Sequence, residues 1–313
     1  MDLLKLTTRP VRRAAIEARS LAALVRAGAF GAEPPRRQLQ ILRALRDYGP
    51  MGAAPRIAAL RHPELPAIAD ERGTLSFAEL DEQVDRLANA LKDRGLVAGS
   101  SVGILCRNHR APLITAFAAS RAGVNAIWLN TAFSARQAAE VAEREGVDLL
   151  VFDEELSGAA DGIEARHGRI PCAADVAGEL DRAIEQGDAS PLPRPARPGR
   201  VVLLTSGTTG TPKGAPRPEP RSLSIPGALL ERMPMRAREG TVIGPPLYHG
   251  TGLIMALLSV SLGSRIVLRT RFDPAGLLAD TERHRATAWC VVPIMLQRLL
   301  ALGEDEIRRH DLS

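Results

Sequence analysis

Residues 201–214 read Val201-Val202-Leu203-Leu204-Thr205-Ser206-Gly207-Thr208-Thr209-Gly210-Thr211-Pro212-Lys213-Gly214. The four apolar residues predict a buried β-strand, and the hydroxyl- and glycine-rich segment after them predicts a loop. Glycine lets a ligand approach the backbone closely. The loop also offers hydroxyl groups, backbone N–H groups and the ammonium group of Lys213. Many donors, one cation and no acid predict a site for a polyanion such as a nucleotide phosphate chain.

Two common phosphate-binding patterns do not fit this loop. The Walker pattern needs glycine before its lysine and a hydroxyl residue after it, whereas Pro212 and Gly214 stand there. Proline has no N–H to offer a phosphate, and glycine has no hydroxyl for a metal ion. The dinucleotide pattern G-x-G-x-x-G does not occur in the loop either. A nucleotide hydrolase of the Walker type is therefore disfavoured.

The stretch from Thr205 to Gly214 resembles the signature loop of the adenylate-forming enzymes, which include acyl-CoA synthetases, luciferases and adenylation domains of peptide synthetases. It matches the family pattern Ser/Thr-Ser/Thr-Gly-Ser/Thr-Thr-Gly-x-Pro-Lys-Gly throughout. The resemblance implies that a carboxylate attacks ATP to form an acyl-adenylate, that coenzyme A then displaces AMP, and that Mg²⁺ assists. It also implies an ATP-binding role for Thr205, Ser206, Gly207, Thr208, Thr209, Gly210 and Lys213.

The composition fits a globular protein of one large domain or two ordinary ones, with 313 residues of which 45% are hydrophobic and 25% charged. The net charge is +5, but lysine occurs only at positions 5, 92 and 213, so the positive charge is mostly scattered arginine. Aromatic residues make up 3%, too few for platforms that stack bases, and nucleic-acid binding is not predicted. In a chain that so rarely uses lysine, Lys213 points to a functional role.

The cysteines and the N-terminus indicate the compartment. Cys106, Cys172 and Cys290 are far apart, and no spacing predicts a zinc site or a redox pair, so no metal ligands are assigned. We expect three buried thiols in a reducing compartment. The sequence has no apolar run near 18 residues and no signal-peptide pattern, so the cytoplasm is the expected location.

The chain is predicted to divide into a helical extension, residues 1–54, and a truncated adenylation domain, residues 55–313, with a proline-rich linker at 188–199 that is expected to be extended and exposed. Residues 10–30 have helical periodicity, with Arg12, Arg19 and Arg26 on one stripe. Such a basic amphipathic helix can contact a membrane surface. Packing against its own domain is the favoured alternative, because the apolar face is mostly alanine.

The rest of the sequence alternates strands and helices, which predicts an α/β fold with mostly parallel sheets flanked by helices. The resemblance implies the N-terminal large domain of an adenylate-forming enzyme. Strands are predicted at residues 66–70, 74–76, 102–106, 124–129, 147–152, 201–204, 241–244, 265–268 and 286–292. Helices are predicted at residues 37–47, 77–94, 112–122, 134–145, 223–236, 253–262, 274–284 and 293–302, with Ser134 as the N-cap of the fourth. The stretch 153–187 is expected to be mostly helical, with a short strand near Ile170 as a possibility.

A second candidate site follows the strand at 241–244, and reads Pro245-Pro246-Leu247-Tyr248-His249-Gly250-Thr251-Gly252. Open α/β sheets bind ligands at the carboxyl ends of their strands. The segment resembles the box where acyl-CoA synthetases place an aromatic residue or histidine beside the acyl pocket. The resemblance implies that Tyr248, His249, Gly250 and Thr251 bind substrate and that His249 borders the reacting carboxylate. Since no aspartate lies between Pro245 and Leu262, a fatty or aryl acid is favoured over an amino acid.

Other parts of the family pattern do not occur in these 313 residues: the Tyr-Gly-x-Thr-Glu segment for adenine and magnesium, the Thr-Gly-Asp box for ribose, the hinge and the small C-terminal domain. We therefore expect an N-terminal part of an acyl-CoA synthetase that is inactive alone and exposes apolar surface near its last strand. The alternative is a non-catalytic nucleotide-binding or interaction protein derived from a shortened synthetase.

Overall fold

The computed structural model describes residues 3–205, 213–217, 222–233 and 235–312, with the backbone alone for residues 3–12, 205 and 213–217. Its strands are β1 (Pro66–Asp70), β2 (Gly73–Ser76), β3 (Ser101–Leu105), β4 (Asn125–Trp128), β5 (Leu149–Asp153), β6 (Arg169–Cys172), β7 (Val201–Thr205), β8 (Lys213–Arg217), β9 (Gly240–Ile243), β10 (Arg265–Leu268) and β11 (Ala288–Cys290). Its helices are α1 (Leu3–Arg26), α2 (Pro35–Arg61), α3 (Phe77–Asp93), α4 (Arg110–Ala122), α5 (Ala135–Glu145), α6 (Ser157–Ala160), α7 (Glu179–Gln186), α8 (Ser224–Arg232), α9 (Gly250–Ser261), α10 (Pro274–His284), α11 (Pro293–Leu300) and α12 (Glu304–Ile307), with a 3₁₀ turn η1 (Glu154–Leu156).

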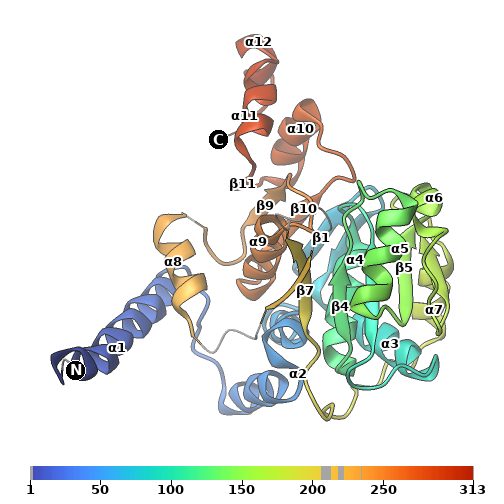
Figure 1. Cartoon of the computed structure of the whole chain (residues 1–313). Helices are drawn as coiled ribbons and strands as arrows, with labels where there is room; N and C mark the ends of the chain where they lie inside the picture. Colours follow the sequence, from blue (N-terminus) through green and yellow to red (C-terminus); the bar gives the residue numbers. More distant parts are fainter. Residues whose placement is uncertain (1–2, 206–212, 218–221, 234, 313) are drawn as a thin grey trace.

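The strands form two sheets (Figure 1). Sheet A has the order β11-β9-β10-β1-β2, and sheet B has the order β6-β5-β3-β4-β7-β8. Neighbouring strands are parallel except at one edge of each sheet, where β2 and β8 are antiparallel to β1 and β7. The predicted α/β architecture with mostly parallel sheets is confirmed.

The side-chain alternation of the strands places helices on both faces of each sheet. In β4, Ala126 and Trp128 join a core shared with α3, α4 and α9, whereas Ile127 joins a second core beneath α5. In β10, Ile266 faces the shared core and Val267 faces α10. Helix α4 is buried along almost its whole length, as expected for a helix between two sheets.

Local sequence signals explain several helix ends. Ser134 caps α5 through a capping box with Gln137, and this confirms the predicted N-cap. Ser76 and Glu79 form the same arrangement at the start of α3. Gly146 ends α5 with a φ of 65°, in the left-handed region that favours glycine.

The N-terminal segment packs against a later part of the chain. Helix α1 lies beside α8, away from the two sheets (Figure 1). At their contact, a Cβ on Gly227 would lie 2.3 Å from the Ser20 Cβ, so only glycine allows this approach. Helix α1 leaves Ile16, Leu21 and Val25 exposed. Among the described helices, none is both long and apolar enough to cross a bilayer.

Several sequence expectations are corrected. The element α2 consists of two helices on either side of Gly49, whose φ of 68° and ψ of 177° are non-helical. The first helix agrees with the one predicted at 37–47, whereas the second, which continues to Arg61, was not predicted. The stretch 153–187 is not mostly helical, because irregular segments separate its short helices, but β6 confirms the short strand considered near Ile170. The linker 188–199 is not wholly exposed, since Leu192 is buried and its carbonyl accepts a 2.6 Å hydrogen bond from the Tyr48 hydroxyl.

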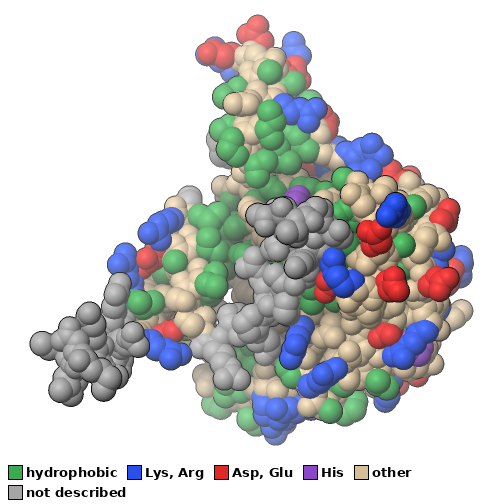
Figure 2. All heavy atoms as spheres, in the orientation of Figure 1, with side chains coloured by type: hydrophobic (Ala, Val, Ile, Leu, Met, Phe, Trp, Pro, Cys, Tyr) green, Lys and Arg blue, Asp and Glu red, His purple; other side chains and the backbone are tan. Residues whose placement is uncertain are grey.

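The surface bears out two further expectations. Positive and negative side chains are interspersed over the sheet-bearing part of the visible face (Figure 2), so the arginines form no single-sign stripe there. Apolar side chains gather over α11, where Ile294, Leu296 and Leu300 are exposed. Apolar surface near the last strand, β11, was expected from the sequence.

Candidate functional site

The glycine-rich loop connects two antiparallel strands. Strand β7 ends at Thr205 and β8 begins at Lys213, and the two residues face each other in the strand register. Ser206, Gly207, Thr208, Thr209 and Gly210 lie in the segment 206–212, outside the described residues. The backbone positions of Thr205 and Lys213 place both ends of the predicted phosphate loop at the carboxyl end of β7.

The second candidate segment leads from β9 into α9. His249 is the N-cap residue of α9 and is exposed, and its ring lies 4.6 Å from the ring of Tyr248, measured between centroids. Gly250 and Thr251 begin the helix, and no described side chain caps its first N–H groups. A helix N-terminus with free N–H groups favours an anion. The carboxylate of an acid substrate would suit this position.

Glycine at position 252 has a packing reason. A Cβ there would lie 2.5 Å from the carbonyl oxygen of Pro246 and 2.8 Å from that of Pro245. The turn before α9 is closed by a 3.0 Å hydrogen bond from the His249 N–H to the Pro246 carbonyl. Gly252 therefore lets the first turn of α9 pack closely on the turn that presents Tyr248 and His249.

Asn108, which the sequence interpretation missed, fixes this turn from the other sheet. Its amide donates to the Pro245 carbonyl at 2.9 Å and accepts from the Leu247 N–H at 2.8 Å, and the side chain is buried. Asn108 follows β3 of sheet B, whereas the turn follows β9 of sheet A. A polar residue three positions after a buried parallel strand was the available signal.

These contacts bring the two predicted site segments to one side of the molecule. Strands β3 and β7 are both parallel to β4, so their carboxyl ends share one edge of sheet B. With strands spaced about 4.8 Å apart, β3 and β7 are separated by about 10 Å. Asn108 holds the turn with Tyr248 and His249 at the end of β3, and the predicted phosphate loop begins at the end of β7.

Replacing Asn108 with alanine should lower the free energy of unfolding by about 1–3 kcal/mol, because a buried carbonyl and a buried N–H lose their partners. The amide hydrogen of Leu247 should also exchange faster with solvent. Urea unfolding and hydrogen exchange measure these two effects. The control is Asn130→Ala, which removes an exposed 2.9 Å hydrogen bond to the Ala132 N–H and should cost about 0.5 kcal/mol or less. Equal effects from the two substitutions would contradict the role of Asn108.

Residues adjacent to Asn108 join the ends of further strands. The Arg107 N–H donates to Asp153 of β5 at 2.8 Å, and the His109 Nε2 lies 2.7 Å from the same carboxylate. Burial alone would raise the pKa of Asp153, but hydrogen bonds from His109 and Arg107 bring it below its usual value. The Arg110 N–H donates to Asp70 of β1 at 2.9 Å. Residues 107–110 thus connect both sheets at their carboxyl ends.

A cavity of about 480 Å³ lies elsewhere. Val147, Asp148 and Arg166 are among its lining residues, and the first two directly precede β5. This is the amino end of the strand, whereas open α/β sheets bind ligands at the carboxyl ends. The cavity is therefore not assigned to the candidate site.

Comparison with known proteins identifies the family. The sequence profile described as "AMP-binding enzyme" matches residues 56–313. The chain belongs to this family. Its glycine-rich loop, its strand order and the turn before α9 all lie within the matched range. This agrees with the resemblance of Thr205–Gly214 to the signature loop of the adenylate-forming enzymes.

Curated proteins that are similar in sequence to this AMP-binding domain include CoA ligases. A feruloyl-CoA synthase from Amycolatopsis sp is 32% identical over 273 residues, which are 86% of this chain and 53% of that protein. A 2-succinylbenzoate–CoA ligase from Geobacillus kaustophilus is 31% identical over 244 residues, 77% of this chain and 48% of that protein. The chain spans about half the length of these curated relatives.

Solved structures support the fold of the AMP-binding domain. The N-terminal domain of FACL13 from Mycobacterium tuberculosis has a TM-score of 0.70 at 18% identity, and the match covers 82% of this chain and 66% of that one. The o-succinylbenzoate CoA synthetase from Bacillus subtilis, in complex with an acyl-adenylate intermediate, has a TM-score of 0.67 at 24% identity, with coverage of 80% and 50%.

Proposed function

We propose that this AMP-binding domain serves a CoA ligase that activates a carboxylic acid as its acyl-adenylate. The observation that carries the proposal is the ten-residue signature from Thr205 to Gly214, which begins at the carboxyl end of a parallel strand and ends in an edge strand. The names of two relatives that are more than 30% identical to the chain, a feruloyl-CoA synthase and a 2-succinylbenzoate–CoA ligase, support the same reaction class.

The roles proposed for the loop residues follow from the negative charge of the ATP phosphates, which hydrogen-bond donors and a cation can bind. The hydroxyls of Thr205, Ser206, Thr208 and Thr209 and nearby backbone N–H groups would hold the β- and γ-phosphates of ATP, while Lys213 supplies a mobile positive charge. Gly207 and Gly210 leave room for the phosphates to approach the backbone. Bound Mg²⁺ would neutralise further triphosphate charge. Together these groups stabilise the negative charge that collects on the departing pyrophosphate.

The substrate carboxylate is proposed to lie at the N-terminus of α9. His249 is exposed there, Tyr248 lies beside it, and the first N–H groups of the helix, including those of Gly250 and Thr251, have no described side-chain cap. The N–H groups orient the carboxylate toward the triphosphate loop, and the imidazole borders it. This placement is supported by the sheet: the loop begins at the carboxyl end of β7, and Asn108 holds the turn before α9 at the carboxyl end of β3, two strands away.

The acid itself is proposed to be fatty or aromatic, with coenzyme A as the acceptor thiol. The helix that follows His249 is apolar, and no aspartate in residues 245–262 is available to bind an amino group. One relative at 28% identity is named a fatty acid–acyl carrier protein ligase, which keeps a fatty acid among the candidates. A cytoplasmic location remains part of the proposal, and for residues 10–30 packing against the rest of the chain is favoured over membrane contact, because α1 lies against α8.

Exchange of pyrophosphate into ATP, tested with ferulate, 2-succinylbenzoate, octanoate and palmitate, examines this function. The assay compares the 313-residue chain with the protein expressed from its gene together with any sequence after codon 313. We expect acid-dependent exchange by the gene product and none by the 313-residue chain. Exchange by the 313-residue chain would refute its predicted inactivity. No exchange by either protein with any acid would refute the ligase role and favour a non-catalytic nucleotide-binding protein.

A further inference from the structure

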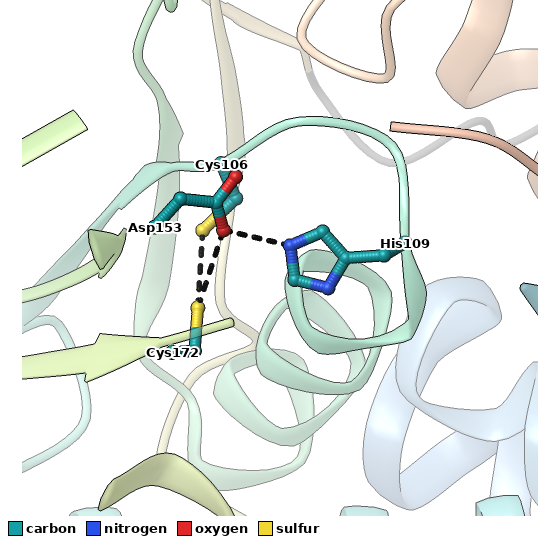
Figure 3. A group of neighbouring side chains, drawn as sticks. All are labelled: Cys106, His109, Asp153 and Cys172. Atoms are coloured by element: carbon teal, nitrogen blue, oxygen red, sulfur yellow. Dashed lines mark hydrogen bonds and ion pairs between the residues drawn. The ribbon is translucent and has the colours of Figure 1, made fainter. Parts of the chain in front are cut away.

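Four side chains with metal-binding atoms meet at the carboxyl ends of three parallel strands (Figure 3). Cys106 follows β3, Asp153 ends β5, Cys172 ends β6 and His109 is the N-cap of α4. All four are buried, and one ligand atom from each lies within 4.8 Å of the others. The cysteines are 66 residues apart in the sequence, so their spacing predicts no metal site. The sheet brings them together because β5 pairs with both β3 and β6.

Two distances in this cluster already match those around tetrahedral zinc. Two thiolates about 2.3 Å from the metal would be about 3.8 Å apart, and a thiolate and a carboxylate oxygen about 3.6 Å apart. The Cys106 and Cys172 Sγ atoms are separated by 3.7 Å, and the Cys172 Sγ lies 3.5 Å from the Asp153 Oδ1. A metal can therefore replace the thiol protons without separating these groups.

The histidine requires a small adjustment. His109 Nε2 lies 2.7 Å from the Asp153 Oδ1, a hydrogen-bond distance, whereas both atoms on one zinc ion would be about 3.4 Å apart. Its Nδ1 accepts from the Ala111 N–H at 3.4 Å, so the ring carries its proton on Nε2. When Nε2 binds a metal, this proton moves to Nδ1, and the long contact with Ala111 opens.

We propose that Cys106, His109, Asp153 and Cys172 form a structural zinc site. Sulfur and imidazole ligands select zinc over magnesium or calcium, which prefer oxygen. Four protein ligands leave no open position for a reacting molecule, so the site holds the fold and takes no part in the ligase chemistry. The Arg107 N–H binds the second carboxylate oxygen of Asp153 at 2.8 Å and thereby orients this ligand.

In the absence of a metal, the protons on the two thiols compete with zinc for the sulfur atoms. Burial raises the pKa of Cys106 well above its usual value. For Cys172 the hydrogen bond with Cys106 lowers the pKa, but burial and Asp153 together outweigh it, so the pKa of Cys172 is also raised. Without a metal, both thiols are protonated and hydrogen-bonded. Zinc binding releases one proton from each thiol. The N-terminus of α4 offsets part of the net negative charge that the two thiolates and the carboxylate leave around the zinc ion.

The zinc content of the folded chain tests the proposal. The tag-free 313-residue protein is produced in zinc-supplemented medium, dialysed against metal-free buffer and analysed by elemental mass spectrometry. We expect about one zinc ion per chain, and at least a tenfold lower content in the Cys106→Ser/Cys172→Ser double variant. Cys290→Ser is the matched control, because Cys290 is also a free buried cysteine, its pKa is raised to about 11, and it lies in sheet A.

Cobalt supplies a second readout if the double variant fails to fold. Co²⁺ bound by thiolates gives a charge-transfer band and intense visible bands, expected for the wild type and Cys290→Ser and weakened in Asp153→Asn. The proposal is overturned if the folded wild type contains no zinc and both thiols are free, if peptide mapping finds a Cys106–Cys172 disulfide, or if the double variant retains as much zinc as the wild type.

Discussion

Arg121→Met is expected to lower the free energy of unfolding by about 3–5 kcal/mol. Arg121 on α4 is fully buried, and its guanidinium contacts Asp81 and Asp85 of α3. Its Nε also donates to the Gly52 carbonyl of α2 at 3.0 Å. Methionine fills much of the volume but leaves two carboxylates with only Arg56 as a cationic partner among the described contacts. The free energy of unfolding falls because the charges of Asp81 and Asp85 lose the guanidinium that compensates them.

The pH dependence of this loss distinguishes an electrostatic cause from lost packing. Burial raises the pKa of Asp85 even beside the guanidinium groups, and removing Arg121 raises it further. A carboxyl group whose folded-state pKa lies above its unfolded value favours folding when protonated, and this stability is lost as the pH rises through the folded pKa. The deficit of the variant should therefore be largest near neutral pH and smaller below about pH 4.

Urea unfolding at neutral and acidic pH measures both effects. The control is Arg136→Met, because Arg136 pairs with Glu140 on the exposed surface of α5 and should contribute about 0.5 kcal/mol or less. A loss below about 1 kcal/mol for Arg121→Met, or a loss that does not change with pH, would show that the buried ion cluster does not stabilise the contact of α2, α3 and α4.

Lys213→Ala is expected to reduce acid-dependent ATP–pyrophosphate exchange by about 100-fold in a catalytically competent gene product, the loss typical of removing one donor from a transition-state site. Lys213 begins β8, directly opposite Thr205 in the hairpin, so its position is set by the pairing of the two strands. Lys213→Arg should restore part of the activity, since it keeps the charge but has a planar head group.

Lys92→Ala is the matched control for this experiment. Lys92 is exposed in the last turn of α3, and the chain contains only three lysines. Exchange should be unchanged by this substitution. If Lys213→Ala exchanged at the wild-type rate, the proposed phosphate role would be wrong, and the loop would be a structural turn.

Local sequence patterns predicted the helices and strands whose ends are set by residues within or next to them. The strand at 265–268 and the helix at 274–284 have the predicted bounds, because Pro274 begins the helix after the N-cap Asp273. Strand β8 was missed because Pro216 argues against regular structure. The strand forms at the edge of sheet B, where a proline is tolerated.

The roles of Asn108 and of the pair His109 and Asp153 were not predicted from the sequence, because they depend on contacts between distant segments. Asn108 and the turn at Pro245 are 137 residues apart, and only the packing of sheet A against sheet B shows that they bond. His109 and Asp153 are 44 residues apart and meet because β3 and β5 are neighbours. A single polar residue after a strand can mark a candidate site, but it does not show which distant segment it contacts. In contrast, the signature loop is contiguous, so it could be recognised from the sequence.

The most direct test of the account is whether the glycine-rich loop binds a triphosphate. Phosphorus NMR of ATP, titrated with the folded 313-residue chain, measures this binding without requiring catalysis. We predict that the β- and γ-phosphate signals shift or broaden with the wild type and with Lys92→Ala, and that Lys213→Ala largely abolishes the effect. Unchanged signals with the wild type, or an equal response to Lys213→Ala, would contradict the assignment of residues 205–213 as the ATP-binding loop.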